Sequence, residues 1–351
     1  MRAAALLSTF ARVSSSPSRP DPPRRLLLIQ KGALGDVTLT TALLDDLHRA
    51  FPDARLDFGV GSAAAPLLEA HPLIGERVII DAAPAWRMAR TIHLRGYDWI
   101  VDVQSSPRTA IITRLSGAAV RIGWRQRVWH RAYTHAIPRV LQQEYVIRAR
   151  RRLLEAAGVP VGESGPHLEL RSEERAAGAQ ALASAGGTTG WPRIGMLLST
   201  TELAKNWPVR HFAALAALLA RDGFTPILFD APGDEARIAA VRAAAPEAIV
   251  APRLRLRAFL GALAACDVLV SADTGPAHMA DALGVRRVTI FGATSPVGWV
   301  PPRPTVVALC SANPPLIDRQ ARARAAGARE EYCADVMPDH VLGAVRELLK
   351  R

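Results

Sequence analysis

The sequence predicts an α/β fold made of two similar halves, each with a parallel sheet covered by helices. Short apolar runs of strand length alternate with segments of helical periodicity from Arg25 onward. A stretch rich in glycine, serine and proline, at 158–166, divides this alternation into two series. With 351 residues, the chain is long enough for two hydrophobic cores. Open α/β sheets bind ligands at the carboxyl ends of their strands, so we expect the site in the cleft between the halves.

The first half is predicted at 24–165. Its first strand, 25–30, leads through a glycine-containing loop into a helical pattern over 37–51. Further runs of strand length occur at 54–60, 77–80, 97–104 and 118–123. Strands that alternate with helices at this spacing are typical of βαβ units. Residues 1–23 have a short apolar run broken by Arg12 and followed by serine and proline; we expect a disordered extension, and a targeting peptide is the alternative.

The second half is predicted at 166–351. A long helix is expected at 172–185, and a second one at 209–223. The runs of strand length in this half are at 193–199, 225–230, 248–252, 267–273 and 286–292. Because the same alternation recurs, we expect a second open parallel sheet that faces the first.

The composition is that of an ordinary globular protein, with 49% hydrophobic and 22% charged residues. No apolar run reaches the length of a membrane span. The three cysteines, Cys266, Cys310 and Cys333, are too few and too scattered for a disulfide framework or a zinc site built on cysteine. We therefore expect a reducing compartment, the cytoplasm.

The charge of the chain is unusual. Lysine and arginine together number 44 against 32 acidic residues, a net charge of +12, yet only three of the basic residues are lysines. A codon bias toward arginine is the simplest explanation for most positions. Since the two cations are not interchangeable at tight sites, an internal lysine in such a chain indicates a special position. Lys31 and Lys205 are the two internal lysines.

A carboxylate follows the first predicted strand, in the sequence Gly32-Ala33-Leu34-Gly35-Asp36. This pattern is not G-x-G-x-x-G, and the next strand ends without an acidic residue, so a dinucleotide site is disfavoured. One interpretation of Asp36 is a helix N-cap. The other is a carboxylate at the mouth of the cleft that accepts a proton, where the glycines allow backbone to come close.

A loop with hydroxyl groups and a lysine follows the first strand of the second half, at 198–208. It contains Thr200, Thr201 and Lys205. A lysine is a point charge that suits phosphate, and the helix that begins near Val209 adds backbone donors. The sequence therefore predicts a phosphate site here, with a merely exposed loop lysine as the alternative.

A third motif, Asp273-Thr274-Gly275-Pro276, leads from a strand into a helix that also contains His278. Pro276 fits the first turn of that helix, where its missing N–H does no harm. The structural alternatives are helix capping by Asp273 or Thr274 and a packed, half-buried His278. Asp-Thr-Gly also occurs in aspartic proteases, but their fold is all-β, and the strand-to-helix setting here argues against that class.

A fourth segment, 291–301, follows the last predicted strand and combines glycine, hydroxyl groups and Trp299. Such a segment can close around a ligand. The alternative is that Trp299 packs as an anchor of the loop.

Together, these motifs resemble glycosyltransferase family 9, the ADP-heptose:lipopolysaccharide heptosyltransferases. The resemblance extends from Arg25 to the end of the chain, and the segments GALGDVTLTTALL, LAKNWP, DTGPAHMADALG and FGATSP occur in the order of the family. It implies a GT-B fold, in which two Rossmann-like domains with parallel sheets face each other. It also implies that the N-terminal half holds the acceptor and the C-terminal half a nucleotide sugar.

The resemblance further implies roles for single residues. Asp36 matches the catalytic base of the family, and Lys205 matches the lysine that contacts the donor diphosphate. Glu235 matches an acidic residue on the nucleoside of the donor, with Asp234 as the alternative register. The residues that match the loop around the donor sugar and phosphates are Asp273, Thr274, Gly275 and His278.

Two cysteines bear on the question of a metal. Cys310 and Cys333 lie near the outer cysteines of a cysteine-bearing segment found in some members of the family. The inner cysteines of that segment are missing here, so the resemblance implies no metal site in this chain.

The implied reaction is an inverting, metal-independent transfer of a sugar, heptose from ADP-heptose, onto a lipopolysaccharide-core or related glycolipid acceptor. Asp36 would take the proton of the acceptor hydroxyl as that oxygen attacks the anomeric carbon. Lys205, Thr200 or Thr201, and amides at a helix N-terminus, would stabilise the leaving diphosphate. The chain has no Asp-x-Asp pattern, and we expect neither a metal nor a cofactor.

Two alternatives stay open at this stage. One is a GT-B glycosyltransferase with a different nucleotide-sugar donor. The other is a non-catalytic protein that binds nucleic acid or an anionic glycolipid. The sequence does not predict the oligomeric state.

Nine arginines alternate with aromatic residues over 121–152. In the acceptor-side half, Arg121, Arg125 and Arg127 suit the phosphates of an anionic glycolipid, and the aromatic residues suit a membrane surface. We therefore expect a cytoplasmic enzyme that is peripheral on the inner face of the cytoplasmic membrane. The alternative is a solvated basic face; nucleic acid would use the same arginines but is not an expected partner.

Overall fold

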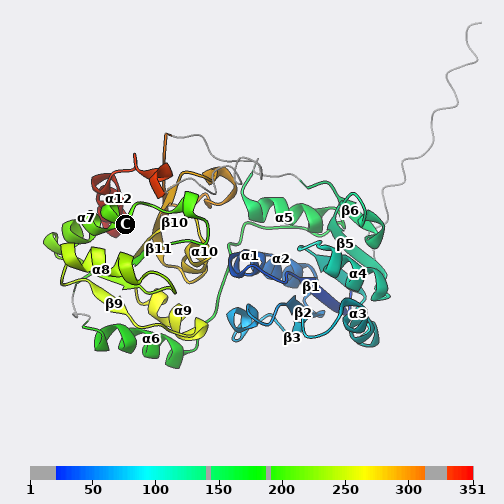
Figure 1. Cartoon of the computed structure of the whole chain (residues 1–351). Coiled ribbons are helices and arrows are strands. Elements are labelled where there is room, and N and C mark those ends of the chain that lie inside the picture. Colours follow the sequence, from blue (N-terminus) through cyan, green and yellow to red (C-terminus); the bar gives the residue numbers. More distant parts are fainter. Residues whose placement is uncertain (1–20, 140–143, 187–190, 313–329, 351) are drawn as a thin grey trace, which may run out of the picture.

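Two parallel sheets of six strands each form the framework of the protein (Figure 1). The structure is a computed structural model, which describes residues 21–139, 144–186, 191–312 and 330–350. The strand order is β3-β2-β1-β4-β5-β6 in the first sheet and β12-β11-β10-β7-β8-β9 in the second. The expected α/β fold with two similar halves is confirmed. The predicted extension at 1–23 lies almost wholly outside the described residues.

The first half alternates strands with helices. Its strands are β1 (Arg25–Ile29), β2 (Arg55–Val60), β3 (Arg77–Ile79), β4 (Trp99–Asp102), β5 (Val120–Trp124) and β6 (His135–Ile137). Its α-helices are α1 (Leu34–Thr40), α2 (Ala42–Ala50), α3 (Ala85–Leu94), α4 (Pro107–Leu115) and α5 (Val146–Glu155). Short 3-10 helices occur at η1 (Ala65–Leu68) and η2 (His130–Ala132).

The second half repeats this plan. Its strands are β7 (Arg193–Leu197), β8 (Thr225–Phe229), β9 (Ile249–Ala251), β10 (Val268–Ala272), β11 (Arg286–Phe291) and β12 (Val306–Cys310). Its α-helices are α6 (Ser172–Ser184), α7 (Val209–Arg221), α8 (Glu235–Ala244), α9 (Leu256–Ala264), α10 (Gly275–Ala282) and α12 (Pro338–Lys350). The 3-10 helices are η3 (Leu203–Lys205), η4 (Pro296–Gly298) and η6 (Glu330–Cys333).

Both faces of the first sheet are buried, which explains why its strands are continuous apolar runs. Leu26 and Leu28 of β1 pack into the core under α1, α2 and α5. Leu27 and Ile29 point to the other face and pack with residues of α3 and α4. The helices therefore form one layer on each side of the sheet.

Two edge strands and one helix boundary differ from the expectation. No strand was expected at β6 or β12, the outermost strands of their sheets. The three residues of β6 are all only half-buried, so this strand lacks the apolar run of the central ones. The single helical pattern expected over 37–51 is two helices, because the chain turns at Thr41 between α1 and α2.

The two halves touch where α1 meets α10. A Cβ atom at Gly35 would lie 2.9 Å from the Cα of Gly275, so this contact requires glycine in α1. A second link lies between α5 and α6, where the chain passes from one half to the other and His167 donates its backbone N–H to Oγ1 of Thr41. The predicted domain border at 165/166 falls in this passage and stays a prediction.

Within the part of the chain that the structure describes, no helix has the length and apolar character that crossing a membrane requires.

Candidate active site

Asp36 lies in the first turn of α1, at the edge of the cleft between the halves. The N-cap of this helix is Ala33, three residues earlier, so the N-cap interpretation of Asp36 is wrong. The side chain of Asp36 is 37% exposed, which leaves its carboxylate accessible to a ligand.

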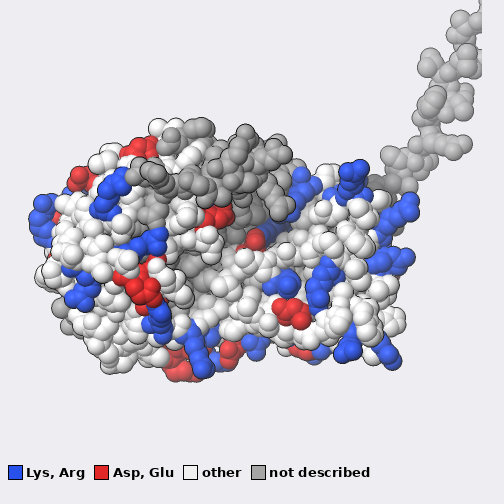
Figure 2. Space-filling model, viewed as in Figure 1, with Lys and Arg blue, Asp and Glu red and all other residues white. Residues whose placement is uncertain are grey.

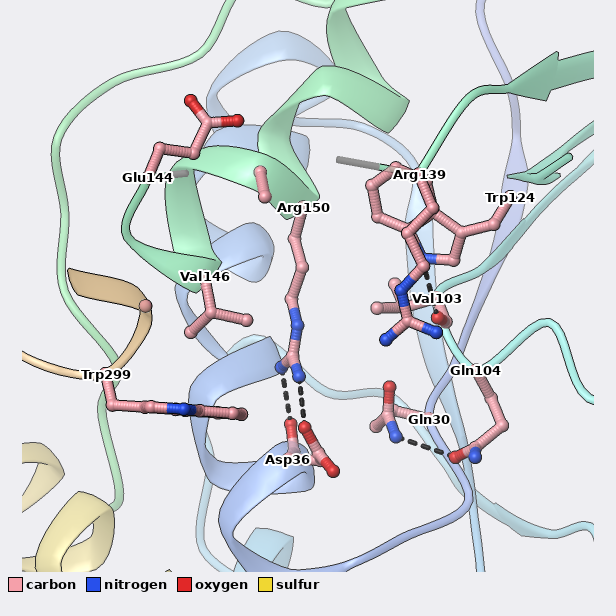
Figure 3. A pocket seen from close by; sticks show the side chains of 12 residues that line it. Gln30, Asp36, Val103, Gln104, Trp124, Arg139, Glu144, Val146, Arg150 and Trp299 are labelled. Carbon is pink, nitrogen blue, oxygen red and sulfur yellow. Dashed lines mark hydrogen bonds and ion pairs between the residues drawn. The ribbon is translucent and has the colours of Figure 1, made fainter. Parts of the chain in front are cut away.

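Arg150 of α5 holds the carboxylate of Asp36 (Figure 3). One guanidinium nitrogen, Nη2, pairs with Oδ1 of Asp36. The other, Nη1, donates to the backbone oxygen of Asp36 at 2.8 Å and to Oγ1 of Thr40 at 2.7 Å. The side chain of Arg150 is only 7% exposed, so burial lowers its pKa while the charge of Asp36 acts in the opposite direction. The guanidinium thus fixes both the main chain and the side chain of this turn.

A cavity lies on the side of Asp36 that faces the first half of the protein (Figure 3). It is lined by Gln30, Asp36, Val103, Gln104, Trp124, Arg139, Glu144, Val146, Ala149, Arg150, Gly298 and Trp299. The side-chain amides of Gln30 and Gln104, which follow the neighbouring strands β1 and β4, are hydrogen-bonded at 2.7 Å. A few polar side chains beside an indole in a concave space are typical of a small-molecule site.

A second pocket lies on the side of Asp36 that faces the second half of the protein. Its lining residues are Ala33, Gly35, Asp36, Lys205, Asp273, Thr274, Gly275, His278 and Trp299. Two residues, Asp36 and Trp299, line both this pocket and the first cavity. The structure thus brings six of the predicted residues to one place, and Asp36 lies between two adjacent pockets.

Lys205 and Asp273 form an ion pair in the wall of this second pocket. Nζ of Lys205 lies 3.3 Å from Oδ2 of Asp273 and 3.3 Å from a carboxylate oxygen of Glu202. The hydroxyl of Thr294, in the loop after β11, donates to the same Oδ2 of Asp273 at 2.9 Å. The ammonium is therefore held at the pocket by two elements of the second half, η3 and the end of β10.

His278 of α10 is almost fully buried. Burial, followed by the charge of Arg287, lowers its pKa to about 3, so the imidazole is neutral at physiological pH. Its Nδ1 has no hydrogen-bond partner among the described residues, and its ring faces Trp299 with centroids 5.5 Å apart. A buried, unpaired imidazole nitrogen at a pocket is a position where a ligand can complete the hydrogen bonding.

Neither Asp273 nor Thr274 caps α10 with its side chain, which was the structural alternative for this loop. Thr274 occupies the N-cap position, but its side chain makes no cap hydrogen bond. Asp273 directs its carboxylate to Lys205 and Thr294 instead. Both side chains are therefore available to the pocket rather than to the helix.

Three of the predicted donor residues lie outside both pockets. Thr200 and Thr201 belong to the loop before η3, where Oγ1 of Thr200 donates to the backbone oxygen of Glu202. Glu235 is exposed at the start of α8 and pairs with Arg253. Asp234, the alternative register, is buried and accepts a hydrogen bond from Ser199 at 2.8 Å.

The basic segment 121–152 does not form one surface. Five of its arginines are bonded to backbone oxygens or carboxylates of the protein: Arg121, Arg148, Arg150, Arg151 and Arg152. Burial lowers the pKa of Arg121, whose guanidinium donates to the backbone oxygens of Ala118 and Ala132. Arg125 and Arg127 remain exposed and line a shallow basic hollow together with Arg131. The structure therefore separates Arg121 from the other two predicted acceptor-side arginines.

Three residues of the candidate site were not predicted: Gln30, Gln104 and Arg150. The first two are the last residues of the predicted strands 25–30 and 97–104, so their place at the carboxyl edge of the sheet was a signal. Arg150 was one of many arginines, and its only signal was a position on the apolar side of an amphipathic helix. Lys31, marked by its rarity, lines a neighbouring hollow next to Asp81.

Comparisons with known proteins give a consistent result. Residues 85–329 match the family model "Glycosyltransferase family 9 (heptosyltransferase)". The chain is 30% identical to lipopolysaccharide heptosyltransferase 1 of Pseudomonas aeruginosa over 78% of its own length and 79% of that protein. It is 22% identical to lipooligosaccharide heptosyltransferase 2 of Haemophilus influenzae, over 93% of this chain and 99% of that one.

Solved structures agree in fold. A glycosyltransferase of family 9 from Veillonella parvula superposes with a TM-score of 0.82 at 23% identity, over 93% of this chain and 98% of that one. An Escherichia coli heptosyltransferase, WaaC, solved with ADP-2-deoxy-2-fluoro heptose, superposes with a TM-score of 0.68 at 22% identity, over 92% of this chain and 99% of that one. The two facing Rossmann-like halves are thus a GT-B fold.

Proposed function

Because the chain belongs to glycosyltransferase family 9, and is therefore a glycosyltransferase, we propose that it transfers heptose from ADP-heptose to a lipopolysaccharide-core or related glycolipid acceptor. The names of its relatives support the sugar and the acceptor, since they are lipopolysaccharide heptosyltransferases. A relative with the same fold was solved with an analogue of ADP-heptose, which supports the donor.

The observation that carries the proposal is the position of Asp36 between two pockets. The cavity that faces the first half holds the acceptor, and the pocket that contains Lys205 and His278 holds the donor. Asp36 takes the proton of the acceptor hydroxyl as the oxygen forms a bond to the anomeric carbon. The bond from that carbon to the diphosphate oxygen breaks with its electron pair. Attack from the side opposite the leaving group inverts the anomeric carbon.

Groups of the protein compensate the negative charge of the leaving diphosphate. Negative charge develops on the leaving diphosphate, and the Lys205 ammonium and the backbone amides at the start of α10 lie at the pocket to stabilise it. Asp273 and Thr294 orient the ammonium. This arrangement lets the reaction proceed without a divalent cation.

The remaining donor contacts are part of the same proposal. Thr200 or Thr201, in the loop that leads into η3, binds phosphate oxygens, and Glu235 at the start of α8 binds the nucleoside. Thr274, Gly275 and the neutral imidazole of His278 contact the sugar and phosphates. Arg150 is a positioning residue, because it touches Asp36 and aims its carboxylate at the acceptor hydroxyl.

A donor screen tests the substrate. Thermal unfolding is measured with ADP-heptose and with UDP- and GDP-sugars at equal concentration. The preferred donor stabilises the folded state by mass action, so we expect ADP-heptose to give the largest increase in Tm. A larger increase with a UDP- or GDP-sugar would overturn the assignment of the donor but not the family.

Replacing the base tests the mechanism. Asp36→Asn keeps the size of the side chain and removes its ability to accept a proton, so we expect turnover to fall by roughly 10²–10⁴-fold. The increase in Tm with ADP-heptose should be nearly unchanged. The matched control is Asp339→Asn, which removes another carboxylate from the first turn of a helix, α12, in the other half of the protein. Undiminished turnover of Asp36→Asn would exclude Asp36 as the base.

A further inference from the structure

Much of the net charge of the protein lies in one part of the first half. Residues 82–139 contain ten arginines against two aspartates, a net charge of +8 out of +12 for the chain. Neither aspartate reaches out to solvent as a free charge. Asp98 accepts the backbone N–H groups of Arg24 and Arg25, and Asp102 is fully buried. The surface of 82–139 therefore has exposed cations and no exposed carboxylate.

The same segment exposes large apolar side chains. Eight such side chains are exposed in the described part of the chain, and four of them lie here: Trp86, Leu94, Leu115 and Val128. Trp86 is 61% exposed and Leu94 is 76% exposed. Single exposed apolar residues need no explanation, but four among so many arginines form an amphipathic surface.

Helix α3 has two distinct faces. Met88, Ala89 and Ile92 are buried against the first sheet. Trp86, Arg90 and Leu94 follow one another at intervals of four, so they form one stripe on the opposite, exposed face. The guanidinium of Arg87 lies over the Trp86 ring, 5.3 Å from its centroid. A helix with arginine, tryptophan and leucine on its free face is typical of helices that lie in a membrane interface.

Neighbouring elements extend this face. α3 packs against α4, and α4 packs against η2. α4 ends with the exposed residues Arg114 and Leu115, and the loop into η2 exposes Arg125, Arg127 and Val128. Figure 1 places these elements at the end of the molecule that points away from the second half. Figure 2 shows basic side chains spread along this end.

We propose that this α3–α4 surface docks the protein onto an anionic lipid bilayer. It consists of Trp86, Arg87, Arg90, Leu94, Arg114, Leu115, Arg125, Arg127, Val128 and Arg131. The arginines pair with lipid phosphates and the tryptophan and leucines enter the headgroup region. A nucleic acid would use the arginines but not the exposed leucines and valine, so the bilayer is the partner that uses both kinds of side chain.

Docking in this way connects the membrane to the active site. Trp124, the last residue of β5, lines the cavity assigned to the acceptor, and Arg125, the next residue, lies on the α3–α4 surface. The end of β5 thus links the docked surface to the wall of the cavity, and a glycolipid anchored in the bilayer would approach the cavity along this part of the first half. This step rests on the proposed function, whereas binding to the bilayer itself does not.

Vesicle co-sedimentation tests the proposal with the full chain. The protein is mixed with vesicles of phosphatidylcholine alone or with added phosphatidylglycerol, without donor or acceptor. We expect binding only to the anionic vesicles, weakening as salt is raised. The variant Trp86→Ser, Arg90→Ser, Leu94→Ser should bind them on the order of tenfold more weakly.

The controls separate docking from folding and from catalysis. The variant Trp191→Ser, Arg221→Ser, Met337→Ser removes a tryptophan, an arginine and an apolar side chain, all exposed, from the second half and should bind vesicles like the unchanged protein. In both variants, the increase in Tm with ADP-heptose should be retained. Equal vesicle binding by both variants, or tighter binding to duplex DNA than to anionic vesicles, would overturn the docking surface. Normal vesicle binding without sugar transfer would overturn the proposed function instead.

Discussion

At the scale of the residue, the contact between Asp36 and Arg150 governs how the site can work. Arg150 comes from a position 114 residues farther along the chain and is nearly fully buried. A buried cation needs a partner, and here Asp36 and Thr40 both serve. The same bonds restrict the rotation of the Asp36 carboxylate. A base must be held in a fixed orientation to meet an acceptor hydroxyl, so this restriction favours the proposed role.

Replacing Arg150 by lysine tests this positioning role. An ammonium keeps the charge but cannot bond the carboxylate, the backbone oxygen and Thr40 in the planar geometry of a guanidinium. We expect Arg150→Lys to lower kcat about tenfold or more, with little change in KM for the nucleotide sugar. Steady-state kinetics with each substrate varied in turn give both constants.

The next residue offers a matched control. Arg151 is also buried on α5 and pairs with a buried carboxylate, Asp46, at 2.7 Å, but it lines neither pocket. Arg151→Lys should cost similar stability in thermal unfolding and leave kcat nearly unchanged. If both variants lose kcat to the same extent, Arg150 only stabilises the helix.

At the scale of the element, the close approach of α1 and α10 determines how the two pockets meet. Gly35 and Gly275 allow the two helices to touch by their backbones, and His278 lies beside the contact. Asp36 follows Gly35 directly, so the distance between these helices sets the distance from the proposed base to the rest of the pocket around Lys205 and His278. Gly35 of α1 thus serves the contact between the halves and not only the turn after β1.

A methyl group at Gly35 tests this contact. Its Cβ would lie 2.9 Å from the Cα of Gly275 and 3.2 Å from Cδ2 of His278, and backbone cannot yield as a flexible side chain does. We expect Gly35→Ala to lower the free energy of unfolding by about 1–3 kcal/mol and to reduce turnover strongly. Denaturant unfolding and turnover measure the two effects.

Gly343 of α12 is the control position. A Cβ there would meet no atom within 4 Å, and alanine is the better helix former. Gly343→Ala should keep or slightly raise stability and leave turnover unchanged. A Gly35→Ala protein as stable and active as the unchanged one would mean that the two helices can move apart without cost.

At the scale of the whole molecule, buried titratable groups couple folding to pH. Burial, and then the charge of His167, lower the pKa of His71 to about 4. Burial raises the pKa of Asp102 to about 6, although hydrogen bonds from Ser105 and Tyr133 oppose this. As pH falls from 6.5 to 4, the unfolded chain protonates His71 while the folded one does not, so this histidine costs stability. Asp102 has the opposite effect: between pH 6 and the pKa of an unfolded aspartate, the folded chain holds its proton more tightly, so this carboxyl adds stability as pH falls.

The variant His71→Asn isolates the histidine contribution. Between pH 6.5 and 4, its free energy of unfolding should fall less steeply than that of the unchanged protein, by up to about 1.4 kcal/mol per pH unit. Denaturant unfolding at a series of pH values measures the slope. The same substitution at the exposed His48 is the control, and equal slopes for all three proteins would refute the assignment.

The fold and part of the site could be predicted because their signals are local in the sequence. Continuous apolar runs such as 25–30 follow from burial of both faces of a parallel sheet, and they repeat with each βαβ unit. Asp36, Lys205 and the loop from Asp273 each follow a strand, so the common carboxyl edge of the sheets brings them to the cleft. Short edge strands such as β6 have no such run and were missed.

The sequence by itself determined the two α/β halves, the loops that meet in the cleft and the excess of arginine. Only the tertiary structure decided which arginine does what, because the packing of distant elements assigns the partners. It buries Arg150 against Asp36, bonds Arg121 to backbone oxygens and leaves Arg90 exposed on the same helix face as Trp86. A guanidinium has the same chemistry in each place, and its role follows from the solvent and the charges that the fold brings to it.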